Sequence, residues 1–160
     1  AQPWRFVTVD TPERRAAVKR NFERANQEAL AGYAGEARTL YARLKLEGLD
    51  EAPLQIAVFA DEATERGAGL GRQTMPETLR YSVVGAIHTL WLAARAEGVS
   101  VGWISILDPA AITRALDVPA EWRLVAYLCL GWPIEEHLDP ELERAGWQER
   151  AASGKFLLRR

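Results

Sequence analysis

The chain has 160 residues, of which 48% are hydrophobic and 26% charged, a composition typical of one soluble globular domain. Its formal net charge of −2 argues against a nucleic-acid partner or an anionic membrane surface, since both require a basic face. No apolar run approaches the ~18 residues of a transmembrane helix, and no signal peptide is visible. Cys129 is the single cysteine and cannot form an internal disulfide. We therefore expect one domain over residues 1–160, located in the cytoplasm.

The first half of the chain predicts two strands separated by helices. Residues 5–9 alternate polar and apolar side chains, and residues 53–60 form a more buried apolar run. Between them, residues 10–12 supply an N-cap and a first-turn proline for a helix, and a second helical stretch ends at Gly48, which suits a C-terminal cap. Residues 61–75 are rich in Gly and Thr without an apolar period, which predicts a long loop of the kind that often covers a site.

The second half predicts a broad apolar helix followed by two more strands. Pro76 opens the helix, Gly98 ends it, and its apolar surface is wide enough to pack on more than one side. Residues 99–106 and 122–130 predict strands, with a short helix from Asp108 between them. The last strand is apolar almost throughout, as expected in the middle of a sheet. This order predicts an α/β or α+β domain with about four strands.

Two basic residues are open to more than one interpretation. The last thirty residues, from Gly131, are polar and extended in pattern, and such tails often wrap a neighbouring subunit. Arg150, close to Trp147, belongs either to a solvated tail or to a phosphate site, because an arginine fork matches a phosphate dianion. Lys45, at the end of a predicted helix, either complements the helix dipole or places a cation near a bound ring or phosphate.

Several familiar catalytic patterns are not met. His88 and His137 are far apart and lack the neighbours that a zinc or iron site needs, so His88 is more simply a core or interface histidine. The glycines of residues 67–71 lie several residues before the next helix, unlike those of a dinucleotide fingerprint. Ser105 lacks a nucleophile elbow and a histidine partner, and Cys129 lies in an apolar run. We expect neither a resident metal nor a Ser or Cys nucleophile.

The stretch from Gly102 to Ser105 is the strongest candidate site. It ends a buried strand in a glycine, a large aromatic and a hydroxyl, shortly before a turn at Asp108. A glycine lets a flat ligand approach the backbone closely, Trp103 can flank that ligand, and Ser105 can offer it a hydrogen bond. From the pattern alone, a serine satisfied by its local backbone is the alternative.

Five segments, taken in chain order, carry a family resemblance. They are Gln2–Phe6, Leu44–Gly48, Gly102–Ile106, Leu128–Gly131 and Pro140–Trp147. Together they resemble the BluB family of 5,6-dimethylbenzimidazole synthases, a branch of the nitroreductase-like flavoproteins, from Gln2 to about Arg150. The resemblance implies a nitroreductase-like α+β fold, with a central mixed sheet flanked by helices, and a homodimer with flavin at the subunit interface.

The resemblance also implies a reaction. Reduced FMN would be the substrate and O2 the co-substrate, and oxygen-dependent fragmentation of the isoalloxazine would yield 5,6-dimethylbenzimidazole, the lower ligand of cobalamin. NAD(P)H could reduce the flavin, or a separate flavin reductase could deliver it. Two alternatives stay open: an NAD(P)H-dependent nitroreductase or flavin reductase that keeps its flavin, and a non-catalytic flavin-binding module.

Residue by residue, the resemblance assigns the site. It places Ser105 near the flavin N5 edge, for positioning or proton handling, with Trp103 beside it. The other expected flavin contacts are Gln2, Lys45, Leu46 and Arg150, the last as phosphate ligand.

One part of the family pattern has no counterpart in this chain. Family members carry an Arg-Arg-Asp-x-Arg motif and a Pro-Ser-x-Gly stretch ahead of Gln-Pro-Trp. That segment resembles a phosphate clamp and supplies an acidic residue. Because nothing precedes Ala1, we expect the chain to be a fragment of a longer protein.

Overall fold

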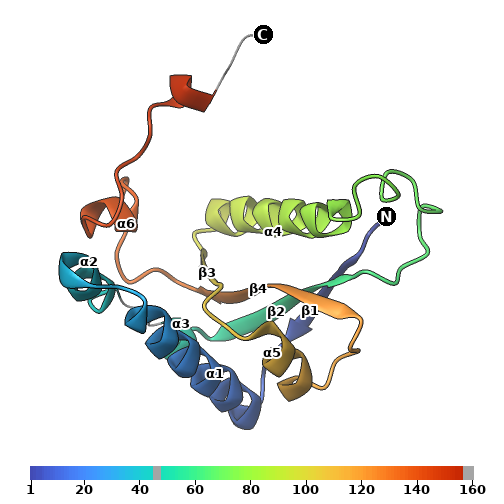
Figure 1. The fold of residues 1–160 in the computed structure, drawn as a ribbon, viewed down its shortest axis with the longest axis horizontal. Helices are drawn as coiled ribbons and strands as arrows, with labels where there is room; N and C mark the ends of the chain where they lie inside the picture. The colour runs from blue at the N-terminus through green and yellow to red at the C-terminus, as the bar shows by residue number, and fades with distance from the viewer. Residues whose placement is uncertain (45–47, 157–160) are drawn as a thin grey trace. The chain divides into compact units, whose positions relative to one another are not determined.

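The computed structural model describes residues 1–44 and 48–156 (Figure 1). The chain divides into two compact units, each taken over its described residues: Ala1–Glu28 with Leu46–Pro133, and Ala29–Lys45 with Ile134–Arg160. The single domain expected over residues 1–160 stays a prediction. Within the described ranges, no helix combines the length and the hydropathy that a membrane-spanning segment requires.

The first unit is built on a sheet with the strand order β1-β2-β4-β3. The strands are β1 (Trp4–Thr8), β2 (Leu54–Asp61), β3 (Ser100–Ile104) and β4 (Trp122–Gly131). The predicted strands are confirmed, and β4 lies in the middle as expected. The expected mixed sheet needs correction, because every described pair of neighbours is antiparallel. The strands β2 and β3 do run in the same direction, but β4 separates them.

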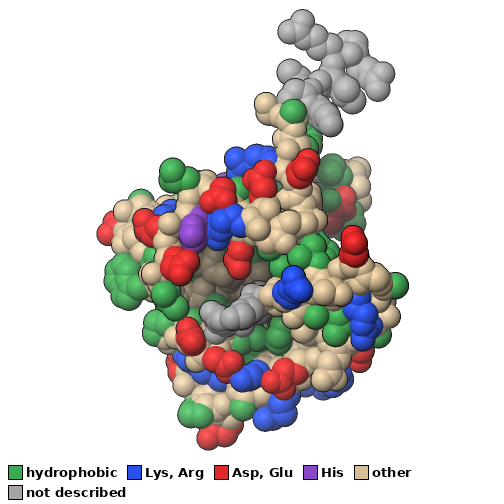
Figure 2. All heavy atoms as spheres, turned by 90° about the vertical axis from the view of Figure 1, so that its left-hand side faces the viewer, with side chains coloured by type: hydrophobic (Ala, Val, Ile, Leu, Met, Phe, Trp, Pro, Cys, Tyr) green, Lys and Arg blue, Asp and Glu red, His purple; other side chains and the backbone are tan. Residues whose placement is uncertain are grey.

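One face of this sheet packs against three helices (Figure 1). They are α1 (Pro12–Ala31), α3 (Gly48–Glu51) and α5 (Pro109–Ala115). Phe59 and Tyr127 from the strands pack with Val18 of α1 and Ile112 of α5 in one buried cluster. The opposite side of α1 is charged, and Figure 2 shows acidic and basic side chains interspersed toward the bottom of its face.

The other face packs against a single long helix, α4 (Thr78–Ala96), two residues shorter at its start than predicted. Val83 and Ile87 of α4 are fully buried against Val58 and Leu128 of the sheet. The side of α4 that points away from the sheet is also apolar, as the breadth of the sequence pattern predicted. Its exposed large side chains are Tyr81, Val84, Trp91 and Leu92.

His88 lies on this outer side of α4. Its ring is exposed and meets the Trp91 ring edge-on, with centroids 6.2 Å apart. The alternative of a core histidine is therefore wrong, because position 88 faces away from the buried Val83 and Ile87.

Gly48 has a different role from the one predicted. The second helical stretch is α2 (Gly35–Tyr41), and Gly48 begins α3 instead of ending a helix. A Cβ at Gly48 would lie 3.0 Å from Cβ of Cys129 on β4, closer than side-chain atoms pack. The glycine is needed here because α3 approaches the sheet closely.

The second unit, taken by itself, contains a cluster of three aromatic rings. Tyr33 and Tyr41 stack with centroids 4.8 Å apart, and the ring of Trp147 meets Tyr33 edge-on at 5.6 Å. Burial raises the pKa of Tyr41. The tail expected to be extended instead contains α6 (Glu141–Arg144) and a 3-10 turn at Ser153–Phe156.

Candidate active site

Ser105 lies at the open edge of the sheet. It follows the last residue of β3, Ile104, which pairs with Tyr127 of β4, and its side chain is exposed. Trp103 is 41% exposed, whereas Ile104 is buried on the opposite face of the strand. The Ser105 hydroxyl is therefore accessible to a ligand, as the sequence predicted, and is not enclosed in the hydrocarbon core.

Gly102 leaves the backbone of β3 uncovered. It pairs with Cys129, and it does not have a positive φ. A Cβ at this position would lie 3.8 Å from the Cys129 carbonyl oxygen, an ordinary van der Waals contact. Neither backbone conformation nor packing within this chain therefore requires a glycine here. The arrangement fits the predicted role, the close approach of a flat ligand to the strand.

The segment from Ser105 to Asp108 is held at its far end. Asp108 caps α5, where its Oδ1 accepts a hydrogen bond from the Ala111 N–H at 3.0 Å. This bond, together with the nearby charge of Arg24, holds the pKa of Asp108 below its usual value. The side chain of Asn21 on α1 also bonds the Asp108 backbone, as Oδ1 accepts from its N–H at 2.8 Å. Sequence reasoning did not identify Asn21, because a mid-helix asparagine carries no periodic signal.

Gln2 lies at the opposite edge of the sheet. It precedes β1, and its Oε1 accepts a hydrogen bond from Arg66 Nη1 at 3.3 Å. Two strands separate β1 from β3, so at about 4.8 Å per pair of neighbours the two edges lie roughly 14 Å apart. Gln2 and Ser105 therefore do not meet within one chain.

The other predicted ligand residues lie elsewhere. Arg150 is exposed in the second unit, three residues after Trp147. Lys45 and Leu46 fall outside the described residues. The structure thus brings Gly102, Trp103 and Ser105 together, and the roles expected for Gln2, Lys45, Leu46 and Arg150 stay predictions.

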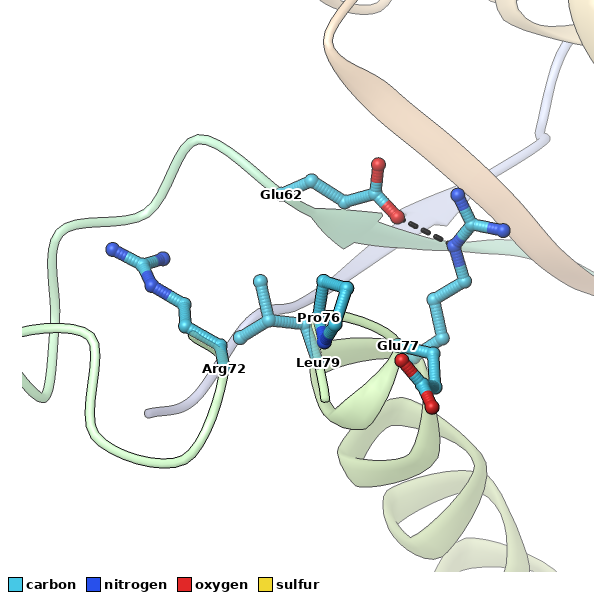
Figure 3. Close-up of a pocket in the computed structure, with 6 residues that line it drawn as sticks. Glu62, Arg72, Pro76, Glu77 and Leu79 are labelled. Carbon is cyan, nitrogen blue, oxygen red and sulfur yellow. Dashed lines mark hydrogen bonds and ion pairs between the residues drawn. The ribbon is translucent and has the colours of Figure 1, made fainter. Parts of the chain in front are cut away.

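A cavity of about 410 Å³ lies where β2 ends and α4 begins. Its lining residues are Glu62, Arg72, Pro76, Glu77, Leu79 and Arg80. Arg80 Nε donates to Glu62 Oε1 at 2.5 Å, and Arg123 Nε lies 3.6 Å from Glu62 Oε2, so this carboxylate is already paired. In Figure 3, Pro76 and Leu79 lie between this ion pair and Arg72, which points away from it. No predicted site residue lines this cavity.

Cys129 is a core side chain, as predicted. Burial raises the pKa of its thiol to about 11, so the thiolate nucleophile is scarce near neutral pH. In the part of the chain that the structure describes, His, Cys, Asp and Glu side chains form no group of three or more that could hold a metal ion.

Comparison with known proteins identifies the family. Residues 1–132 match the nitroreductase family. The 5,6-dimethylbenzimidazole synthase of Rhodospirillum rubrum is 66% identical over 150 residues, which cover 94% of this chain and 71% of that synthase. A synthase of the same name from Rhodobacter capsulatus is 52% identical, with 93% and 72% covered. The chain belongs to the 5,6-dimethylbenzimidazole synthase family.

Solved structures confirm the nitroreductase-like α+β fold. Iodotyrosine deiodinase, bound to FMN and 3-iodo-L-tyrosine, matches with a TM-score of 0.69 at 24% identity, over 88% of this chain and 73% of that one. A nitroreductase-like protein from Streptococcus mutans matches with a TM-score of 0.61 at 18% identity, over 94% and 77%. At these identities the likeness concerns the fold alone.

Proposed function

We propose that this protein is a 5,6-dimethylbenzimidazole synthase, which consumes reduced FMN and O2 and releases the lower ligand of cobalamin. The observation that carries the proposal is the 66% identity, over 94% of the chain, with the Rhodospirillum rubrum synthase. The exposed edge of β3 supports it independently, because its shape and polarity suit a flat heterocycle.

The chemistry of the β3 edge suits a flavin ring. Among the described strands, β3 pairs only with β4, so on its other side its N–H and C=O groups can bond the polar rim of the ring. Gly102 gives the ring access to the backbone, and the exposed indole of Trp103 can cover part of the ring. The Ser105 hydroxyl can donate one hydrogen bond and accept others, so it can orient the ring or hold a proton at its edge.

A second copy of the chain would complete this site. Because Gln2 and Ser105 lie on opposite edges of one sheet, a site that contains both requires two chains. The outer side of α4 supplies a surface for such a contact, since Tyr81, Trp91 and Leu92 are 48–60% exposed. Side chains three, four and seven residues apart share one side of a helix, so these residues form an apolar stripe. We infer a homodimer that uses this stripe.

The remaining contacts follow the family resemblance. Arg150 is the proposed phosphate ligand, and its exposed guanidinium can bind a phosphate dianion through two hydrogen bonds. Gln2, Lys45 and Leu46 are proposed to contact the flavin. The source of the reduced flavin, either NAD(P)H or a separate reductase, and the cytoplasmic location stay predictions from the sequence.

Incubation of the protein with FMN, a reducing system and air tests the proposed function. We expect flavin to disappear and 5,6-dimethylbenzimidazole to accumulate, as measured by mass spectrometry. Removal of a hydroxyl that positions the ring or handles a proton should slow product formation by about 100-fold or more, so Ser105→Ala is the decisive variant. Thr113→Ala, which removes an exposed hydroxyl on the neighbouring α5, should retain full activity.

Two outcomes would contradict this proposal. Recovery of intact FMN after reoxidation would favour the flavin reductase alternative. Parallel loss of folding, dimerisation and activity in Ser105→Ala would show that the serine is structural.

A further inference from the structure

Asn21 is a buried polar residue in the middle of α1. Its side chain is 7% exposed and lies on the same side of the helix as the fully buried Val18. Asparagine is a weak helix former, because its short amide competes for backbone hydrogen bonds. A buried amide must also find partners to offset its lost hydration. The position of Asn21 therefore needs an explanation outside its own helix.

Both ends of the Asn21 amide bond the backbone of one distant residue, Asp108. Oδ1 accepts from the Asp108 N–H at 2.8 Å, and Nδ2 donates to the Asp108 carbonyl oxygen at 3.4 Å. The amide thus pairs with the main chain as a neighbouring strand would, across a sequence separation of 87 residues. This contact fixes the start of α5 against α1.

We infer that Asn21 is the residue that positions Ser105, acting through the backbone of Asp108. Ser105 is separated from Asp108 by only two residues, and on its other side Ile104 is paired with Tyr127. The segment is therefore anchored at both ends, by the sheet and by Asn21. Asn21 does not touch the flavin in this account; it sets where the Ser105 hydroxyl lies. The inference rests on the proposed role of Ser105.

Arg24 provides a matched contrast. It lies on the same helix and contacts the same residue, but through the carboxylate: its Nη2 is 3.5 Å from Asp108 Oδ2. Both side chains are about half exposed, at 57% and 45%, and ion pairs of this kind contribute little to stability. Loss of Arg24 should therefore leave the backbone of Asp108 in place.

The first test uses hydrogen exchange on the protein without flavin. In Asn21→Leu, the Asp108 N–H and C=O lose their partners, so amides of residues 105–111 should exchange about tenfold faster or more. Arg24→Gln should stay within about threefold of the wild type, since it leaves both backbone bonds intact. Unchanged exchange in Asn21→Leu would refute the anchoring role.

The second test separates positioning from folding. Asn21→Leu should lower kcat by about tenfold or more and change KM for reduced FMN by less than about threefold, because misplacement of a catalytic group affects the transition state. Val18→Ala, which destabilises the same helix without touching Asp108, should keep kcat. In a Ser105→Ala background, Asn21→Leu should have no further effect on kcat. An additive effect, or an equal loss in Val18→Ala, would overturn the inference.

Two further variants keep the test decisive. If Asn21→Leu does not fold, Asn21→Ala removes the same two bonds with a residue that favours helix, and the same results are expected. Asn21→Asp keeps an oxygen for the Asp108 N–H and should retain most of the exchange protection and kcat. If Ser105→Ala proves fully active, the proposed role of Ser105 fails, whereas the exchange measurement still decides whether Asn21 anchors the segment.

Discussion

The two long helices on opposite faces of the sheet differ in what they present on their outer sides. On α1, which buries Val18, the exposed residues are charged, among them Glu13, Arg14, Arg20, Glu23 and Arg24. On α4, which buries Val83 and Ile87, they include Tyr81, Val84, Trp91 and Leu92. The inner sides of the two helices do the same work, so only the outer sides distinguish a helix that faces water from one suited to a protein contact.

The largest expected effect comes from placing a charge on the outer side of α4. Trp91→Glu should raise the dissociation constant of the proposed dimer by about 100-fold or more, since a buried interface tryptophan is lost and a carboxylate must be desolvated. Sedimentation measured over a range of protein concentrations gives this constant. Arg20→Glu, on the exposed side of α1, should leave it unchanged. Wild-type association by Trp91→Glu would remove α4 from the proposed interface.

The inner sides should instead respond alike. Val18 and Val83 are both fully buried, one on each face of the sheet. Truncation to alanine at either position should lower the free energy of unfolding by about 2 kcal/mol, from lost burial and the cavity left behind. Urea titrations at one fixed protein concentration measure both losses. A loss in only one variant would show that the two faces do not form equivalent cores.

The smallest expected effect concerns the polar link between α1 and α5. Because the folded protein lowers the pKa of Asp108 below 3.8, the ionised carboxylate stabilises the fold above that pH, and this contribution is lost as the pH falls through the folded pKa. Thermal unfolding at a series of pH values should show Asp108→Asn less stable than the wild type near neutral pH. The difference should shrink toward zero in acid. A difference that increases in acid would reverse the assigned sign.

The sequence predicted the elements of the sheet better than their arrangement. The apolar run of residues 122–130 indicates a strand buried on both faces, and the structure confirms it as β4. Which strands flank it depends on long-range pairing, which a local pattern does not encode, so the antiparallel order was missed. Gly48 was misassigned for the same reason, because its requirement comes from Cys129, 81 positions further along the chain.

The candidate site was predictable only in its local part. Gly102, Trp103 and Ser105 are adjacent in sequence, so one unusual strand end identified all three. Asn21 was missed because its significance depends on Asp108, and the separation of Gln2 from Ser105 follows only from the strand order. Contacts between distant segments are the part of a site that sequence patterns do not reveal.

The position of β4 also constrains how the protein is made. It is the last strand in the chain, yet it lies between β2 and β3. While a ribosome is still synthesising the preceding residues, the nascent polypeptide has no partner for the inner edge of β2, whose backbone groups stay open to wrong pairing. The sheet can therefore close only late in translation, and its non-local pairings favour slow folding. A nascent chain stalled before Trp122 would contain both neighbours of the central strand but not the strand that joins them.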